Sequence, residues 1–326
     1  MPYGQVLVDT VKDSLNNVLA PASAVFRNRI INGAMVIDQR NAGASTANGN
    51  GYLYGLDRWQ FAGTQASKYT YQQNAGSVAT PAGFSNYCGI TSSSAYSVAA
   101  GDYFVFGQRI EGFNTADLGW GTANAKTVTL SFQVYSSLTG TFGGSITNSA
   151  QTLSYPFSYT ISSANTWTSI SITIAGITSG TWVGATNGIG LALWLGLGSG
   201  STYSATAGSW QSGIYFTATG ATSVVGTSGA TFYITGVQLE VGTNATSFDY
   251  RPYGTELQLC QRYYQNNGSN LIYNGTQYTS AWWVVQMRSN PTIVLSSGTI
   301  NAQSLYGFNA SSTVTSNFSV TASAEL

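Results

Sequence analysis

Hydrophobic and polar residues alternate along most of the chain between Ile30 and Tyr253. In KTVTLSFQVYSS every second residue from Val128 to Val134 is hydrophobic, and TWTSISITIAG and QTLSYPFSYTIS follow the same period of two. That period is typical of half-buried strands, whereas GIGLALWLGLG is apolar on both faces, as a central strand is. Clusters such as SSLTGTFGG and GATNG separate the strands. The pattern predicts an all-β, jelly-roll-like antiparallel β-sandwich over residues 30–253.

The period changes after Pro252, and residues 254–326 are predicted to form a second unit. TELQLCQRYYQ fits a short helix in which Thr255 and Gln258 resemble a capping box. The apolar face of this helix would comprise Leu257, Cys260 and Tyr264. Strand patterns return in YTSAWWVVQMRSNPTIVLSS and NFSVTASAEL, which predicts a small C-terminal β domain. A domain of about seventy residues is marginally stable alone, so it should pack on the sandwich or on another copy of the chain.

Two neighbouring tryptophans, Trp282 and Trp283, lie in one of these C-terminal strands. Successive side chains of a strand point to opposite faces of the sheet. One indole can therefore enter the core of the small domain, while the other must meet a different surface. We expect that surface to be a neighbouring chain, and a partly exposed tryptophan is the alternative.

The first 29 residues fit a short strand and a helix equally well. Either element is too short to bury its own apolar face. Residues 1–29 are therefore predicted to be an N-terminal attachment segment that packs on another copy or on another protein.

Charge is scarce, because only 7% of the residues are ionised, against about 25% in typical soluble domains. Eleven cations balance eleven anions, so the chain has no field to attract nucleic acid or an anionic membrane. No run of eighteen apolar residues occurs, so we expect no membrane insertion. No secretion leader is visible, and an extracellular role would need another route, such as lysis of a host cell. A neutral surface rich in hydroxyls and amides suits a permanent assembly or contact with a hydrated glycan.

The chain contains no histidine, which excludes Ser-His-Asp and Cys-His catalysis and His-ligated zinc. Cys88 and Cys260 could form one disulfide, but two buried thiols are favoured. Glu111 and Asp117 are the most plausible carboxylate pair for glycan hydrolysis, yet each is better interpreted as structural. We therefore predict no catalytic residues, no metal site, no cofactor and no enzymatic activity.

Aromatic residues in glycine-rich loops are the candidate ligand contacts. Trp120 and Trp182 lie in such loops, and Trp210 lies in AGSWQSGIY. Sugar rings stack on flat aromatic faces while amides and carboxylates bind their hydroxyls, so Asn114 and Asp117 are the candidate polar contacts. A loop tryptophan that covers the end of a sandwich is an equally common arrangement. Three other tryptophans lie in strand-like patterns and are predicted to be core: Trp59, Trp167 and Trp194.

Six residues at the boundary of the two predicted domains form a candidate joint: Glu240, Asp249, Arg251, Pro252, Glu256 and Arg262. Proline fixes its own φ and keeps the preceding residue extended, so the connection should be stiff. The carboxylates and Arg262 can pair with Arg251 or with a neighbouring chain. Ion pairs of this kind fix register more than they add stability.

Several stretches resemble tailed-bacteriophage tail fibre or receptor-binding proteins. They are FRNRIINGAMVIDQRNAG, DRWQF, the segment from QRIEGFNTADLGWGTANA to TWTSISITIAG, and FYITGVQLEVGTNATSFDYRPYGTELQLCQRYY. MRSNPTIVLSS and VTASAEL are similar to the C-terminal module of those proteins, and RPYGTELQLCQRYY is the most specific stretch. The resemblance implies a virion protein made in the host cytoplasm, usually trimeric, with a sandwich similar to carbohydrate-binding modules. Such modules often carry an Asp in the last strand, where this chain has Thr235 and Gly236, so no metal site is carried over.

Three functions follow in order of preference. The first is a tail fibre or receptor-binding protein that recognises a bacterial surface polysaccharide without cleaving it, as a homotrimer bound to tail or capsid proteins through residues 1–29. The second is a structural virion component, such as a capsid decoration, adaptor or collar protein. The third is a surface-glycan depolymerase.

Overall fold

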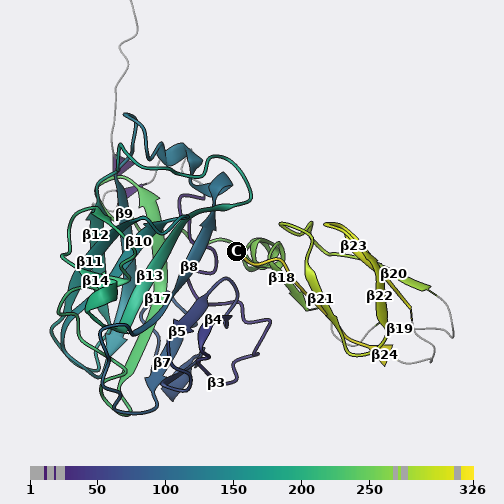
Figure 1. The fold of residues 1–326 in the computed structure, drawn as a ribbon, viewed down its shortest axis with the longest axis horizontal. Coiled ribbons are helices and arrows are strands. Elements are labelled where there is room, and N and C mark those ends of the chain that lie inside the picture. Colours follow the sequence, from purple (N-terminus) through teal and green to yellow (C-terminus); the bar gives the residue numbers. More distant parts are fainter. Residues whose placement is uncertain (1–10, 13–17, 20–25, 267–270, 273–277, 312–316) are drawn as a thin grey trace, which may run out of the picture.

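The computed structural model describes residues 11–12, 18–19, 26–266, 271–272, 278–311 and 317–326. Figure 1 shows a large β-sandwich beside a smaller β module, with a short helix between them. Most of the predicted attachment segment lies outside the described residues. Of its elements, only β1 (Val11–Lys12) and β2 (Val18–Leu19) are described, and they pair antiparallel. The attachment role of residues 1–29 stays a prediction.

Two antiparallel sheets form the sandwich, which confirms the all-β prediction. The seven-stranded sheet has the order β15 (Gln211–Ser212), β11 (Leu153–Ile161), β10 (Gly140–Asn148), β13 (Ile189–Ser199), β8 (Tyr103–Glu111), β5 (Gln60–Gly63) and β4 (Gly51–Tyr54). The six-stranded sheet has the order β12 (Thr168–Ile174), β9 (Val128–Ser136), β17 (Thr231–Val241), β7 (Cys88–Ser92), β6 (Tyr69–Gln73) and β3 (Thr46–Ala47). Two short strands, β14 (Ser204–Ala205) and β16 (Thr217–Ala218), pair parallel.

In strands with the period-two pattern, one face packs in the core between the two sheets and the other faces outward. On β9, Leu130 and Val134 are fully buried, whereas Ser131 and Gln133 face outward and are partly exposed. Strand β13 is buried on both faces because a second apolar cluster, which contains Trp194 and Phe216, covers its other side. The structure thus explains why β13 alone lacks alternation among the long strands quoted above.

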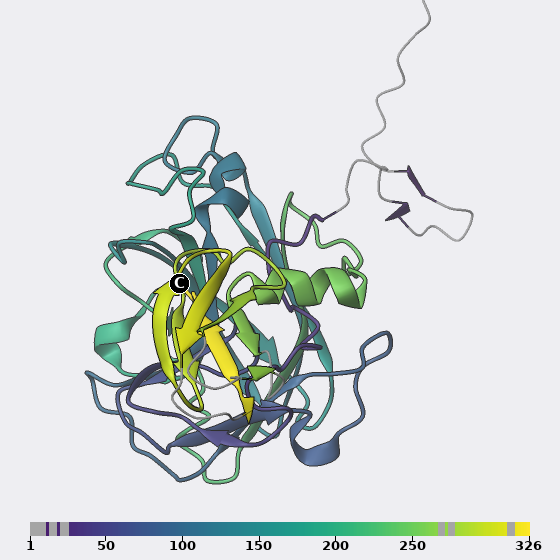
Figure 2. The same ribbon diagram turned by 90° about the vertical axis from the view of Figure 1, so that its right-hand side faces the viewer.

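Three small sheets form the C-terminal module: β18 (Tyr264–Asn266), β25 (Val320–Ser323) and β21 (Thr292–Leu295); β19 (Leu271–Ile272) and β24 (Asn317–Phe318); and β20 (Tyr278–Trp282), β23 (Gly307–Ser311) and β22 (Thr299–Gln303). Figure 2 shows this module in front of the sandwich, with the helix at one side. Trp283 is 7% exposed and stacks on Phe308, whereas Trp282 is 77% exposed. The two indoles point to opposite faces, as predicted.

Helix α1 (Tyr253–Gln261) connects the two parts. The predicted capping box is wrong, because the helix begins at Tyr253 with Pro252 at the N-cap, and no side chain caps it. The extended backbone before a proline and the fixed φ of the proline itself set that start, so Thr255 falls inside the first turn. Cys260 packs against Ile31 and Ile37 of the sandwich and is a free buried thiol, as is Cys88. The prediction of two thiols is thereby confirmed.

Hydrogen bonds through Asn28 and Gln238 connect the charged residues of the candidate joint other than Arg262. Arg251 pairs with Glu256 at 3.2 Å and also donates to the carbonyl oxygen of Ile30. Arg262 instead forms an ion pair with Glu111 of strand β8. The carboxylates of Glu240 and Asp249 accept hydrogen bonds from uncharged donors, namely Thr246 and Gln238 for Glu240 and the backbone N–H of Asn28 for Asp249.

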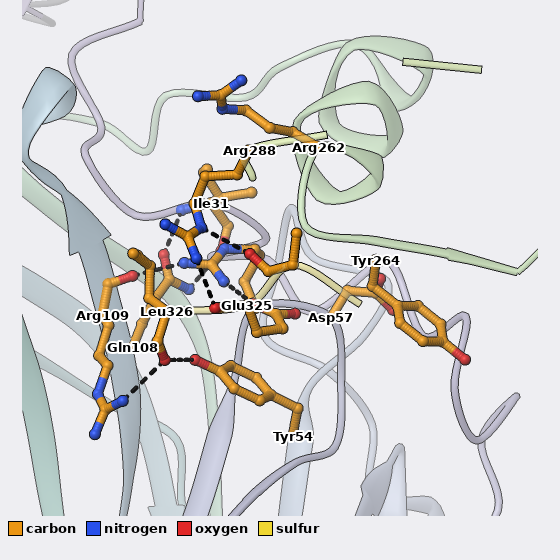
Figure 3. A network of polar contacts seen from close by, with 12 residues as sticks. Ile31, Tyr54, Asp57, Gln108, Arg109, Arg262, Tyr264, Arg288, Glu325 and Leu326 are labelled. Carbon is orange, nitrogen blue, oxygen red and sulfur yellow. Dashed lines mark hydrogen bonds and ion pairs between the residues drawn. The ribbon is translucent and has the colours of Figure 1, made fainter. Parts of the chain in front are cut away.

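A different set of contacts holds the module on the sandwich, and we call it the anchor: Tyr54, Arg58, Arg40, Arg109, Arg288, Glu325 and Leu326. Figure 3 shows Tyr54, Arg109, Arg288, Glu325 and Leu326 of this set. Glu325 forms ion pairs with Arg58 and, at 2.9 Å, with Arg40. The carbonyl oxygen of Leu326 accepts hydrogen bonds from Arg109 and from Tyr54, at 2.8 and 2.7 Å. These contacts join strands β4 and β8 to residues that directly follow β25, so they set the angle between the two parts.

Asp57 lies buried beside the anchor and provides a test by pH. Its carboxylate accepts two hydrogen bonds from Gln39 and lies 4.0 Å from Arg40. Burial nevertheless raises the pKa of Asp57 to about 6, from an ordinary value of 3.8, against the opposing effects of Arg40 and the Gln39 bonds. Asp57 of the folded protein therefore binds its proton more tightly than Asp57 of the unfolded chain does. The free energy of unfolding falls as the pH rises from about 4 to about 6, because the carboxyl group then loses its proton inside the fold.

We expect Asp57→Asn to remove that contribution. The difference in free energy of unfolding, variant minus wild type, should increase by about 2–3 kcal/mol from about pH 4 to pH 6. Above pH 6 this difference should stay constant. Urea unfolding of both proteins at each pH measures the difference. A difference that does not change with pH would contradict the assignment.

Candidate functional site

Three loops of the sandwich bring the candidate tryptophans together. Trp120, Trp182 and Trp210 contact one another edge to face, with ring centroids 4.9–5.5 Å apart and planes 79–84° apart. Each indole N–H donates to a backbone carbonyl, of Lys126, Ser179 and Ala175 respectively. Gly121 permits the close approach, because its φ is +85° and a Cβ there would lie 2.8 Å from the Trp182 ring. We call these three residues the tryptophan cluster.

Burial leaves little ring surface of the tryptophan cluster accessible to a sugar. Trp120 is only 6% exposed and belongs to the main core, while Trp182 and Trp210 are partly buried against that core. Edge-to-face packing also occupies ring faces that a sugar would need. The burial favours the alternative interpretation, a plug over one end of the sandwich, while the glycan contact stays a prediction.

The candidate polar contacts are turned toward another partner. The carboxylate of Asp117, in the 3-10 helix η3 (Ala116–Leu118), accepts two hydrogen bonds of 2.7 Å from Arg29. The backbone oxygen of Asn114, in η2 (Gly112–Asn114), accepts a third from the same guanidinium. The carboxylate of Asp117 and the backbone oxygen of Asn114 therefore hold Arg29, and Asp117 also lies 3.9 Å from the ammonium group of Lys126.

The outer face of the six-stranded sheet carries rows of small polar side chains. Residues at alternate positions of the edge strand β12 and its neighbour β9 point away from the core, and the register pairs Ser169 with Gln133 and Ser171 with Ser131. Ser169 donates a hydrogen bond of 3.0 Å to the side-chain oxygen of Gln133. Hydroxyls and amides of this kind can both donate to and accept from a sugar hydroxyl.

An aromatic wall rises beside these rows. Phe84, Phe248 and Tyr250 contact one another with ring centroids 4.8–5.5 Å apart. The wall stands at a bulge of β17, where the register shifts between Thr235 and Gln238. Gly236 lies in the bulge with a φ of +64°, and a Cβ there would come within 2.5 Å of the Phe84 ring. The bulge and its glycine therefore seat the wall on the sheet.

Wall and rows enclose a cavity of about 420 Å³, which we call the outer groove. Its polar lining comprises Ser131, Gln133, Ser169, Ser171, Thr246 and Ser247. None of its lining residues carries a formal charge, and burial raises the pKa of Tyr250, so that phenol is neutral at pH 7. Farther along the same face, Tyr135 stacks on Tyr233 and contacts Trp167, which extends the aromatic surface along the strands.

The outer groove can bind an uncharged polar ligand, but it has no paired carboxylates for acid–base chemistry. Within the described ranges, no group of three or more His, Cys, Asp and Glu residues could hold a metal ion. No helix in the same part of the chain is long and apolar enough to span a bilayer. Glu111 and Asp117, the candidate hydrolytic pair, are each bound to an arginine.

Sequence reasoning missed the outer groove for a physical reason. The period of two identifies which residues of β9 and β12 face outward, and that signal was present in the serines and the glutamine. Phe84 and Tyr250 come from loops 166 residues apart, and no local pattern shows that both fold over the same sheet face. Only the bulge signal at Gly236, a glycine inside a strand pattern, pointed to a close approach at this position.

The sequence matches no protein-family model, and the search of curated proteins found no match. Among solved structures, the enzymatically active domain of tailspike protein 4 from bacteriophage CBA120 is 13% identical, covering 66% of this chain and 22% of that domain, at a TM-score of 0.33. Arabinose-bound MgGH51 α-L-arabinofuranosidase is 10% identical, covering 74% of this chain and 31% of that enzyme, at 0.39. A CBM4 structure is 15% identical, covering 65% of this chain and 98% of its own, at 0.30. The chain thus spans less than a third of the first two structures, and TM-scores this low decide nothing about its function or site.

Proposed function

We propose that this protein recognises a polysaccharide without cleaving it, and that the outer groove is the binding site. The observation that carries the proposal is the composition of the groove, in which a floor of hydroxyls and an amide meets a wall of three aromatic rings and no formal charge is present. A sugar ring needs both a flat apolar partner for its C–H face and hydrogen-bonding groups for its hydroxyls.

The setting we propose is the surface of a phage virion, with the chain acting as a tail fibre or receptor-binding protein on a bacterial surface polysaccharide. Support comes from the resemblance of RPYGTELQLCQRYY and its flanks to such proteins. The homotrimer, the attachment through residues 1–29 and the virion location belong to the same proposal. Three copies would raise the avidity for a repetitive polysaccharide well above the affinity of one groove.

A structural virion component is the second candidate, because a surface with so few charges suits permanent contacts with other subunits. Labelled protein seen by electron microscopy on intact particles would separate a tail position from a capsid position. A depolymerase is the third candidate, and the release of reducing ends from polysaccharide would reveal it.

We expect Tyr250→Ala and Gln133→Ala each to weaken binding to an array of neutral bacterial polysaccharides by about tenfold, since each removes one stacking or hydrogen-bonding partner. The matched control is Tyr253→Ala, because Tyr253 is an exposed tyrosine three residues farther on and does not line the outer groove. Wild-type binding by both groove variants would refute the site. Failure of the wild type to bind any polysaccharide on the array would refute the proposed function.

A further inference from the structure

Trp282 differs from every other tryptophan of the chain in its surroundings. The remaining seven donate their indole N–H to a protein oxygen: Trp59, Trp120, Trp167, Trp182, Trp194, Trp210 and Trp283. For Trp282, the part of the chain that the structure describes supplies no such bond, and 77% of the residue is exposed. An indole that is mostly exposed presents a flat aromatic face on which a ligand can stack, and its N–H can donate to a ligand.

The strand pairing keeps the space beside this indole open. Trp282 of β20 lies opposite Gly307 of β23, which has no side chain to cover the ring. A Cβ at Gly307 would come within 2.3 Å of the backbone oxygen of Ala281, so larger residues are excluded there. The result is a hollow of about 210 Å³ that borders the Trp282 ring, large enough for a single sugar ring but small for an extended peptide.

Polar side chains line the same hollow. Ser280 lies opposite Asn309 in the pairing of β20 with β23, and the amide of Asn309 donates to the Ser280 hydroxyl at 3.1 Å. The amide nitrogen of Asn301 continues the row with a bond of 3.4 Å to Asn309. Gln303 and Ser304 complete the polar part of the lining. Amides and hydroxyls beside an open aromatic face are the two elements that a sugar ring requires.

The absence of ionised side chains from the lining of the hollow indicates which ligands it can bind. Residues 264–326 contain only two ionised side chains, Arg288 and Glu325. Both are used at the anchor, where Arg288 donates to the backbone oxygens of Ala324 and Glu325, and Glu325 pairs with Arg40 and Arg58. The hollow therefore has no charged group of its own that would attract an acidic or basic ligand, and it matches an uncharged one.

We propose that Trp282, Gly307 and Asn309 form a second carbohydrate site, separate from the outer groove, which takes one uncharged sugar ring. The inference rests on the proposed function only in assuming that the ligand of the protein is a glycan. The indole stacks on the C–H face of the ring, and its N–H, Asn309 and Gln303 bind ring hydroxyls. Two sites on one chain would let the module and the sandwich bind separate segments of one polysaccharide, which raises avidity.

The test follows the indole N–H signals of the full-length protein by NMR while neutral sugars are added. The probes are glucose, galactose, mannose, rhamnose and N-acetylglucosamine, because one stacked ring should bind with a Kd in the millimolar range. The signal of Trp282 is identified by its loss in Trp282→Phe. We expect this signal to shift saturably with at least one sugar. In Trp282→Ala, where the backbone N–H signals of Gly307 and Asn309 report binding instead, we expect the affinity for that sugar to fall about tenfold or more.

Three variants separate this site from its alternatives. Tyr306→Ala, an exposed aromatic of the same module that does not line the hollow, should leave the Trp282 shift unchanged. Gln133→Ala should also leave it unchanged, so the outer groove and the Trp282 site can fail independently. No shift of the Trp282 signal with any of the five sugars would overturn the proposal. A lower oligomer mass of Trp282→Ala by light scattering would overturn it too, because the indole would then be a contact between chains.

Discussion

Replacing Glu325 by glutamine should destabilise the protein by about 3–5 kcal/mol, because it leaves a buried arginine without its counter-charge. The side chain of Arg58 is 1% exposed, and that of Glu325 is 5% exposed. The guanidinium carbon of Arg58 also lies 3.5 Å from the ring centroid of Tyr263, so the ring covers one face of the guanidinium and keeps water from hydrating that face. The glutamine keeps the shape of the side chain, and the effect measured is therefore that of the charge.

A matched variant distinguishes this effect from a general loss of an ion pair. Glu111→Gln breaks the pair with Arg262, whose side chain is 29% exposed and can be hydrated when its partner is lost. We expect Glu111→Gln to cost about 1 kcal/mol. Urea unfolding at one protein concentration gives both values. Equal losses for the two variants would contradict the claim that burial makes the Arg58–Glu325 pair critical.

We also expect the loss of stability in Glu325→Gln to be greatest in the C-terminal module. The core of the C-terminal module is small, with Trp283, Phe308 and Phe318 as its buried aromatic residues, so its stability should depend on the anchor. Hydrogen exchange in Glu325→Gln should therefore accelerate in β21 and β25 before it accelerates in β9 or β13. Simultaneous acceleration throughout the sandwich would show that the two parts unfold as one unit.

Local patterns predicted the elements of this fold well. The alternation in KTVTLSFQVYSS corresponds to β9 with its expected inward face, and the neighbouring tryptophans at the end of β20 divide between core and solvent as extended backbone requires. The change of period after Pro252 corresponds to helix α1. Each of these features is decided within about ten residues, where side-chain periodicity dominates.

Features that depend on distant pairs were not predictable in the same way. Arg58 and Glu325 are 267 positions apart, and nothing near either residue identifies the other as its partner. The sequence instead suggested that the charges around Arg251 would pair with it or with a neighbouring chain, but Arg262 pairs with Glu111, 151 positions away. The outer groove likewise depends on two loops that are far apart in the sequence. Topology, not composition, decides which charges and rings become neighbours.

Trp120 is the clearest case in which one residue type allowed two interpretations, and its substitution by alanine separates them. In the structure Trp120 is almost fully buried, contacts both other rings of the tryptophan cluster and donates its indole N–H to Lys126 at 2.8 Å. Truncation of a buried tryptophan leaves a large cavity and an unpaired carbonyl. We therefore expect Trp120→Ala to lower the free energy of unfolding by about 3–5 kcal/mol.

Trp282→Ala is the control for the expected loss of stability in Trp120→Ala. Because Trp282 is mostly exposed, the same truncation there should change the free energy of unfolding by no more than about 0.5 kcal/mol. Urea unfolding of both variants gives the stabilities, and the polysaccharide array gives the binding. If Trp120→Ala unfolds at the wild-type urea concentration but loses array binding, the residue is a glycan platform and the plug interpretation is wrong. If it is destabilised as expected, and binds normally under conditions where it is still folded, then the tryptophan cluster closes the end of the sandwich. Sugar stacking would then be left to the outer groove and to Trp282, where aromatic rings are exposed beside hydroxyls and amides.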